Sequence, residues 1–234
     1  MIEAAQSATA DQDEPRSLAQ AGTAISAAER VLQAAKMSVR RKVAEAGGLD
    51  GCQHAAHGLS WLATYVEALR QLHNWGRRLT ETGAFGELEQ ALLALGMAEY
   101  AAQIAGGIPM SQGETARLRD MDVDAAEVRR FEDSTADLIA DGTSDGLKRR
   151  LAELIAALPP GELAGNSGLD ETHAAIQEQM RRFSEAEVAP YAQEWHLANA
   201  YIPMEVIGKL GELGVFGITL PEAYGGLGLG KEAM

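Results

Sequence analysis

Hydrophobic residues recur with a helical period along most of this chain. From Arg16 onward, apolar positions are spaced by three, four or seven residues, which places them on one face of a helix. That face consists of Leu18, Ile25, Ala28, Leu32, Ala35, Val39 and Val43. Gly47 and Gly48 tolerate positive φ angles, so we expect them to end this helix.

The same period predicts four more helices, over residues 50–79, 85–105, 124–140 and 144–157. For the helix over 85–105, the pattern puts Leu88, Leu92, Leu95, Ala98, Ala102 and Ala105 on the inward face. Residues 108–119 are interrupted by Pro109 and Gly113, so we expect them to be non-helical. Amphipathic helices joined by short turns form antiparallel bundles, and residues 16–158 are therefore predicted to be a helical bundle.

Two segments lack this pattern. Residues 1–15 carry four acidic residues, no basic residue and few large apolar groups, so we expect a disordered acidic tail. Residues 159–168 are rich in proline and glycine and are predicted to be a linker. A further helical domain is therefore expected over 169–234.

The region after the linker contains two further predicted helices. Asp170 is a good N-cap for a helix that runs to about Val188. Pro203 lies in the first turn of a helix that ends near Leu213. We expect residues 215–220 to be extended and 221–228 to form a loop. The last four residues are typical of the start of another helix, so we expect this domain to be incomplete.

Composition agrees with an all-α fold, because aromatic residues make up only 5% of the chain and strands enrich them. The formal net charge of −14 disfavours binding to nucleic acid or to anionic membranes.

Cys52 is the only cysteine, which fits a reducing compartment. The sequence contains neither a signal peptide nor an apolar run of about 20 residues that could span a bilayer. We therefore expect a soluble, cytoplasmic protein without membrane insertion.

Three ordered motifs near the C-terminus carry a family resemblance. They are FSEAEVAP at 183–190, PMEVIGKLGELG at 203–214 and GITLPEAYGGLGL at 217–229. In order and spacing they resemble the start of the N-terminal helical domain of the acyl-CoA dehydrogenase family. The resemblance covers about the last 65 residues.

The resemblance implies a flavoprotein oxidoreductase. Family members bind FAD and oxidise the Cα–Cβ bond of an acyl-CoA, with a glutamate as the base and the flavin as the hydride acceptor. An electron-transfer acceptor and a homo-oligomeric assembly are then the expected partners. In the family, the base and most flavin contacts come from later domains. We therefore assign no catalytic residue here, and we expect this chain alone to be incomplete, inactive and without FAD.

The resemblance also implies a role for the glycine-rich loop. Tyr224, Gly225 and Gly226 match the family loop near the acyl pocket, where glycine lets the backbone approach a ligand. The substrate expected from the family is a short or branched acyl-CoA.

The predicted bundle is an extension that ordinary family members lack. Its size, and the stretch EYAAQIAGGIPMSQGE at 99–114, resemble the methylsuccinyl-CoA dehydrogenase branch of the family. Gln103, Gly106 and Gly107, followed by Arg119 and Asp120, are similar to the family motif Q-x-x-G-G-x-G…R-D. That motif approaches the diphosphate–adenine half of the cofactor, so the resemblance implies that Gln103, Gly106 and Gly107 bind FAD.

A second part of the extension is similar to the family motif E-G-T-S, which carries or neighbours the catalytic glutamate in some members. Here the motif reads Asp141-Gly142-Thr143-Ser144, with a shorter carboxylate, and Pro109 replaces the third glycine of the first motif. The extension is thus either a degenerate copy of the family's C-terminal bundle or an unrelated bundle with a Gly-Gly helix cap and a Ser/Thr turn.

Two alternatives concern function. The chain can be a non-catalytic helical scaffold that mediates oligomer contacts.

His54 and His57 share a helix face and can in principle meet a metal, but the sequence offers no clear third ligand, so we predict no metal site.

Overall fold

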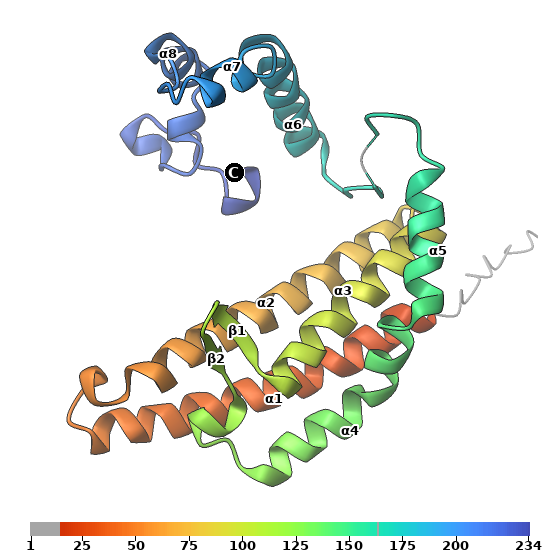
Figure 1. The fold of residues 1–234 in the computed structure, drawn as a ribbon, viewed down its shortest axis with the longest axis vertical. Coiled ribbons are helices and arrows are strands. Elements are labelled where there is room, and N and C mark those ends of the chain that lie inside the picture. The colour runs from red at the N-terminus through yellow and green to blue at the C-terminus, as the bar shows by residue number, and fades with distance from the viewer. Residues whose placement is uncertain (1–14, 163) are drawn as a thin grey trace, which may run out of the picture. The chain divides into compact units, whose positions relative to one another are not determined.

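The computed structural model describes residues 15–162 and 164–234, which form two compact units with their boundary in the chain between Ser167 and Gly168. The predicted acidic tail lies outside the described residues, apart from Pro15. Both units are helical, which confirms the all-α prediction (Figure 1).

The first unit is an antiparallel bundle of four long helices. Its elements are α1 (Arg16–Glu45), α2 (Gln53–Glu81), α3 (Glu87–Gly106), β1 (Ile108–Ser111), β2 (Glu114–Ala116), α4 (Ala125–Gly142) and α5 (Asp145–Ala156). Figure 1 shows α1 to α4 side by side, with α1 packed against α2 and α4, and α3 packed against the same two neighbours. The helix α5 packs on α3. Short 3₁₀ helices precede α2 and α4, at Leu49–Cys52 and Leu118–Met121.

Small residues on α1 let its neighbours approach closely. Five alanines of this helix are buried, at positions 21, 24, 27, 28 and 35. Larger side chains from the other helices fill the remaining space, including Leu62, Leu69, Leu93, Met97 and Phe131. This arrangement matches an aromatic-poor sequence, because the core reaches high packing density with aliphatic groups.

The helix α3 does not bury the face that the sequence pattern predicts. Its buried apolar residues are Ala91, Leu93, Met97, Ala98, Ala101 and Ile104. Of the predicted inward set, only Ala98 is buried, while Leu88, Leu92 and Leu95 are half-buried. The prediction was wrong because α3 is apolar on nearly all sides, so periodicity alone does not identify the core-facing side.

Between α3 and α4 lies a hairpin that the sequence analysis did not predict as strands. The antiparallel pair has Ile108 opposite Ala116 and Pro109 opposite Thr115, with an irregularity before Ser111. Ile108 and Ala116 are buried, because the hairpin packs on α2 and its first strand also contacts α3. Pro109 cannot donate a hydrogen bond, which fits its place on a two-stranded ribbon.

The second unit contains three short α-helices, α6 (Glu171–Phe183), α7 (Ala192–Leu197) and α8 (Met204–Glu212). Asp170 caps α6 by accepting a hydrogen bond from the His173 amide, as predicted, and a π-helical turn follows at Ser184–Val188. The expected extended segment at 215–220 is wrong, because Val215–Gly217 is a 3₁₀ turn that folds back after Gly214. Further 3₁₀ turns occur at Glu222–Tyr224 and Lys231–Ala233.

The segment before the second unit is tied to the bundle at one point. The Asn166 amide donates to Glu89 Oε1 at 2.8 Å, and its carbonyl accepts from Trp75 Nε1 at 2.8 Å. Of the ten residues predicted to form the linker, at least Asn166 is therefore held by the first unit.

We predict that Phe131→Ala lowers the free energy of unfolding of the bundle by about 3–5 kcal/mol, because Phe131 is almost completely buried and the truncation leaves a cavity. Urea denaturation followed by circular dichroism measures the change. The matched control is Ile155→Ala on α5, a side chain that is 42% exposed. We expect the control to change stability by no more than about 0.5 kcal/mol.

Candidate functional site

The first candidate site lies at the C-terminal end of α3. The Tyr65 hydroxyl on α2 donates to Gln103 Oε1 at 2.7 Å. This bond uses the amide oxygen of Gln103 and leaves its Nε2 group without a partner among the residues that the structure describes. Burial, together with the nearby Tyr100, raises the pKa of Tyr65 and keeps its hydroxyl protonated. Gln103 is therefore fixed so that it can donate to a ligand.

The two glycines of this site have different surroundings. A Cβ on Gly106 would meet no atom within 4 Å, so the backbone there is open. A Cβ on Gly107 would lie 2.7 Å from Thr115 Cγ2 and 3.3 Å from Arg117 Cγ, and the residue has φ +133°. The hairpin alone thus explains Gly107, whereas Gly106 leaves room for a ligand.

The polarity of this helix end bears on any phosphate ligand. The C-terminus of a helix carries partial negative charge, which opposes an anion. Arg117 lies beside Gly107 and is exposed, and its guanidinium makes no ion pair within the described ranges. The groups that fit a diphosphate here are therefore Gln103, Gly106 and Arg117, and only Arg117 supplies positive charge. Arg117 was missed in the sequence analysis, because its approach to Gly107 depends on the hairpin.

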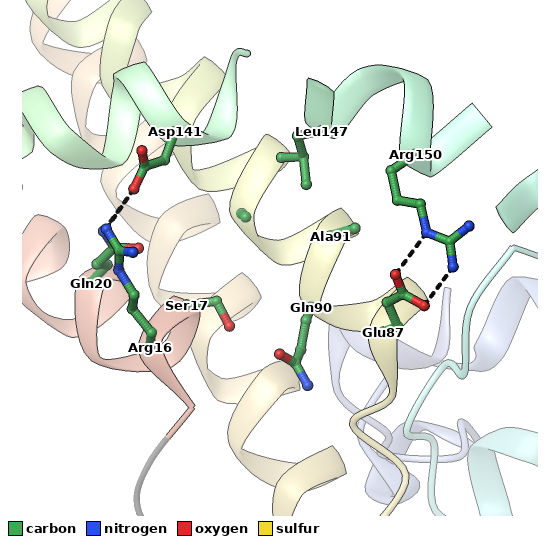
Figure 2. A pocket seen from close by; sticks show the side chains of 10 residues that line it. Arg16, Ser17, Gln20, Glu87, Gln90, Ala91, Asp141, Leu147 and Arg150 are labelled. Carbon is green, nitrogen blue, oxygen red and sulfur yellow. Dashed lines mark hydrogen bonds and ion pairs between the residues drawn. The ribbon is translucent and has the colours of Figure 1, made fainter. Parts of the chain in front are cut away.

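The second candidate, Asp141, stands at the rim of a pocket of about 270 Å³ (Figure 2). Arg16 Nη2 lies 2.8 Å from Asp141 Oδ2, and Gln20 Nε2 donates to the same oxygen at 3.5 Å. The next residue, Gly142, lies against α3, where a Cβ would come within 2.5 Å of the Ala94 carbonyl oxygen. The carboxylate of Asp141 thus has a structural role, because its ion pair with Arg16 links α4 to α1.

A second ion pair closes the opposite rim of the pocket. Arg150 on α5 forms a bidentate pair with Glu87, with Nε–Oε1 at 2.7 Å and Nη2–Oε2 at 2.8 Å. Hydrogen bonding by Arg150 lowers the pKa of Glu87. Figure 2 shows Ala91 and Leu147 between the two ion pairs, so the pocket has apolar walls and charged rims.

The structure does not bring the two motifs of the extension together. Gly142 contacts α3 at Ala94 and Ala98, whereas Gly106 and Gly107 end that helix. The helical rise places these contacts about 14–20 Å from Gly107 along α3. The two motifs therefore do not form one site, and a small ligand group cannot contact both at once.

The third candidate is the loop in the second unit. Tyr224 is 83% exposed, and Gly225 follows it in the left-handed region with φ +80°. A Cβ on Gly226 would lie 2.2 Å from the Leu220 carbonyl oxygen. Backbone hydrogen bonds from Leu227 to Gly217 and from Gly228 to Leu220, at 2.9 and 2.8 Å, hold the loop. Gly226 is therefore required by packing within the loop, and Tyr224 is the side chain that the loop presents outward.

The histidines of α2 have local partners. His54 Nδ1 lies 3.3 Å from Glu114 Oε1, its Nε2 lies 3.6 Å from Asp120 Oδ2, and His57 Nε2 accepts from Trp61 Nε1 at 3.0 Å. Within residues 15–162 and 164–234, no three metal-ligating side chains gather into a group that could hold an ion. In the same described part of the chain, every helix is too short or too polar to cross a bilayer.

Comparison with known proteins finds a family model that matches the second unit. Residues 170–234 match the model of the acyl-CoA dehydrogenase N-terminal domain. This match confirms the resemblance found at the three C-terminal motifs.

The bundle is shared with at least one relative. The chain is 42% identical over 219 residues to (2S)-methylsuccinyl-CoA dehydrogenase from Cereibacter sphaeroides, an alignment that covers 92% of this chain and 39% of the relative. The alignment must therefore include most of the bundle, which confirms the predicted resemblance of the extension to that branch.

Other relatives match only a short segment. Glutaryl-CoA dehydrogenase from Desulfococcus multivorans is 37% identical over 54 residues, covering 23% of this chain and 14% of the relative. Bovine isovaleryl-CoA dehydrogenase (Bos taurus) is 40% identical over 65 residues, covering 27% and 15%. The chain thus spans about two fifths of the methylsuccinyl-CoA dehydrogenase and about a seventh of these two enzymes.

We predict that Gly226→Ala destabilises the second unit by about 1–3 kcal/mol, because the added methyl group collides with the Leu220 backbone. The control is Gly225→Ala, which meets no atom within 4 Å and costs only the strain of a positive φ, about 1 kcal/mol. Hydrogen exchange of the amides of residues 217–229 measures both. Equal protection in the two variants would contradict the assigned role of Gly226.

A further prediction concerns the ion pair between Glu87 and Arg150. The folded-state pKa of Glu87 lies below the ordinary value of 4.5, so its contribution to stability is present above that value and is lost as the pH falls through the folded-state pKa. Carbon-detected NMR titration is expected to show the lowered pKa, and Arg150→Gln is expected to restore the ordinary one. Arg149→Gln, which removes a neighbouring charge on the same helix, is expected to leave the titration nearly unchanged.

Proposed function

We propose that this chain forms the N-terminal part of a flavin-dependent acyl-CoA dehydrogenase that oxidises the Cα–Cβ bond of a short or branched acyl-CoA. The observation that carries the proposal is the single 219-residue alignment with (2S)-methylsuccinyl-CoA dehydrogenase. Because that alignment runs through both units, it favours the substrate class of this relative over those of relatives that align over only 54–65 residues. Methylsuccinyl-CoA is the substrate we propose.

FAD is the cofactor of the proposed enzyme. The groups of this chain that fit its diphosphate are Gln103, Gly106 and Arg117, since each offers a hydrogen-bond donor or open backbone at one place. Gly107, which the sequence pattern also suggested, supports the hairpin turn that keeps Arg117 there. When bound, FAD supplies the acceptor for the hydride. The described residues would orient one end of the cofactor and provide no base.

The loop at Tyr224–Gly226 is proposed to border the acyl pocket. Its backbone hydrogen bonds make it rigid, and the exposed Tyr224 hydroxyl is the group that it can offer to a ligand. A rigid loop keeps this hydroxyl in place before the substrate arrives.

A second candidate function for the bundle is a non-catalytic scaffold that contributes to self-association. The observation that favours its non-catalytic part is the ion pair between Asp141 and Arg16 within the bundle. The carboxylate that stands in the position of the family's E-G-T-S motif is neutralised within the bundle, so a structural role accounts for it.

The proposal is tested by acyl-CoA-dependent dye reduction with protein expressed from the complete reading frame. We expect turnover with methylsuccinyl-CoA to exceed turnover with glutaryl-CoA or isovaleryl-CoA. Turnover with none of the three would contradict the proposal. The chain of 234 residues, purified alone, is expected to show no flavin absorption near 450 nm, and a stoichiometric flavin spectrum would contradict its assignment as a part without the flavin-holding domain.

A further inference from the structure

The chain between α5 and α6 is fixed to the bundle close to its far end. Residues 157–169 separate the last residue of α5 from the N-cap of α6. Within this stretch, Asn166 uses both polar groups of its backbone. Its amide donates to Glu89 Oε1, and its carbonyl oxygen accepts from Trp75 Nε1, each at 2.8 Å. We call Gly165 and Asn166 the latch.

The bundle holds both partners of the latch in place. Glu89 lies in the first turn of α3, is buried, and also accepts from the Gly86 amide at 3.1 Å. Trp75 lies on α2, and its ring meets that of Phe85 edge to face, with the centroids 6.3 Å apart. The acceptor and the donor for Asn166 are therefore provided by two helices that pack on each other.

Gly165 lets the chain come close to α3. This residue has φ +87°, and a Cβ on it would lie 2.9 Å from Leu92 Cδ1 and 3.6 Å from Glu89 Oε1. Gly161 has the same φ of +87°, but a Cβ there would meet no atom within 4 Å. The two glycines thus share a backbone conformation, and only Gly165 combines it with a close approach to the bundle.

The latch is held by few groups. Asn166 is exposed, and an exposed hydrogen bond contributes little net stability because water can replace either partner. A segment with few buried contacts opens at a low cost in free energy while the rest of the structure stays folded. We therefore expect the latch to open and close on an intact bundle.

We propose that Gly165 and Asn166 form a reversible latch that sets the length of the tether between the two units. With the latch closed, only residues 167–169 separate it from the N-cap of α6, and three residues span at most about 10 Å. With the latch open, residues 157–169 form the tether and span at most about 45 Å. The latch therefore controls how far the second unit can move from the bundle. This inference goes beyond the proposed dehydrogenase function and does not depend on it.

Hydrogen exchange of the Asn166 amide, followed by NMR in the 234-residue chain, tests the closed state. W75F removes the Nε1 donor and keeps an aromatic ring beside Phe85. We expect the Asn166 amide to exchange about fivefold faster in this variant, because one hydrogen bond shifts an opening equilibrium by about that factor. The control W61F also removes a bonded tryptophan donor from α2, the one that bonds to His57, and is expected to leave the exchange unchanged.

The two glycines supply a second matched pair. Alanine is strained by the positive φ at both positions, but only G165A also pushes the chain away from Leu92. We expect G165A to speed the exchange of the Asn166 amide and G161A to leave it nearly unchanged.

The tether length is tested with the double variants W75F/G165A and W61F/G161A. A longer tether lets the second unit tumble more independently of the bundle. We therefore expect ¹⁵N relaxation to give a shorter rotational correlation time for the amides of α6 in W75F/G165A than in W61F/G161A or the unchanged chain.

Three results would overturn the proposal: an Asn166 amide that is unprotected in the unchanged chain, exchange that neither W75F nor G165A accelerates, or equal correlation times for α6 in the two double variants. Circular dichroism melting separates opening of the latch from unfolding of the bundle. Should W75F/G165A melt early, G165A alone is compared with G161A, since both residues lie outside the helices. No substrate or cofactor enters these measurements, so failure of the dehydrogenase assignment would leave their outcome unaffected.

Discussion

The close contact of Gly142 with α3 is the constraint on which the second half of the bundle depends. A Cβ at this position would lie 2.5 Å from both the Ala94 carbonyl oxygen and the Ala98 Cβ. Because glycine allows α4 to reach the surface of α3, the turn that follows is fixed, and Ser144 caps α5 from there. The ion pair of Asp141 with Arg16 and that of Arg150 with Glu87 both follow from this placement.

The bundle therefore uses for its own stability several residues whose pattern suggested a ligand site. Asp141 is neutralised by Arg16, and Gly107 makes room for Thr115 of the hairpin. Gln103 is different, because its bond from Tyr65 fixes the side chain while its amide nitrogen remains available. In the second unit, Gly226 packs against the Leu220 backbone, whereas the Tyr224 side chain is exposed. In each motif only part of the pattern is free to meet a ligand.

Much of this fold could be predicted from the sequence, for identifiable reasons. The stripe on α1 is unambiguous because exposed polar residues separate its apolar ones, and Gly47 and Gly48 end it as expected. The Asp170 cap is equally local. What failed depends on contacts between segments, since amides of the following loop donate to the carbonyls of Gly217, Ile218 and Leu220 and hold the expected extended segment in a turn. The approach of Arg117 to Gly107 and the partner of Asp141 likewise depend on a register between helices that periodicity does not fix.

The nearly uniform apolar surface of α3 has a consequence for the folding pathway. A helix that can bury either of two sides offers the collapsing chain two rotational settings of similar apolar area, which is a source of frustration in the energy landscape. Glu89 distinguishes them. In the native setting its carboxylate accepts hydrogen bonds from the Gly86 and Asn166 amides, at 3.1 and 2.8 Å. The bond from Gly86 is local and would turn with the helix, but in the rotated setting the buried carboxylate would lose the Asn166 amide. This polar side chain therefore favours the native setting.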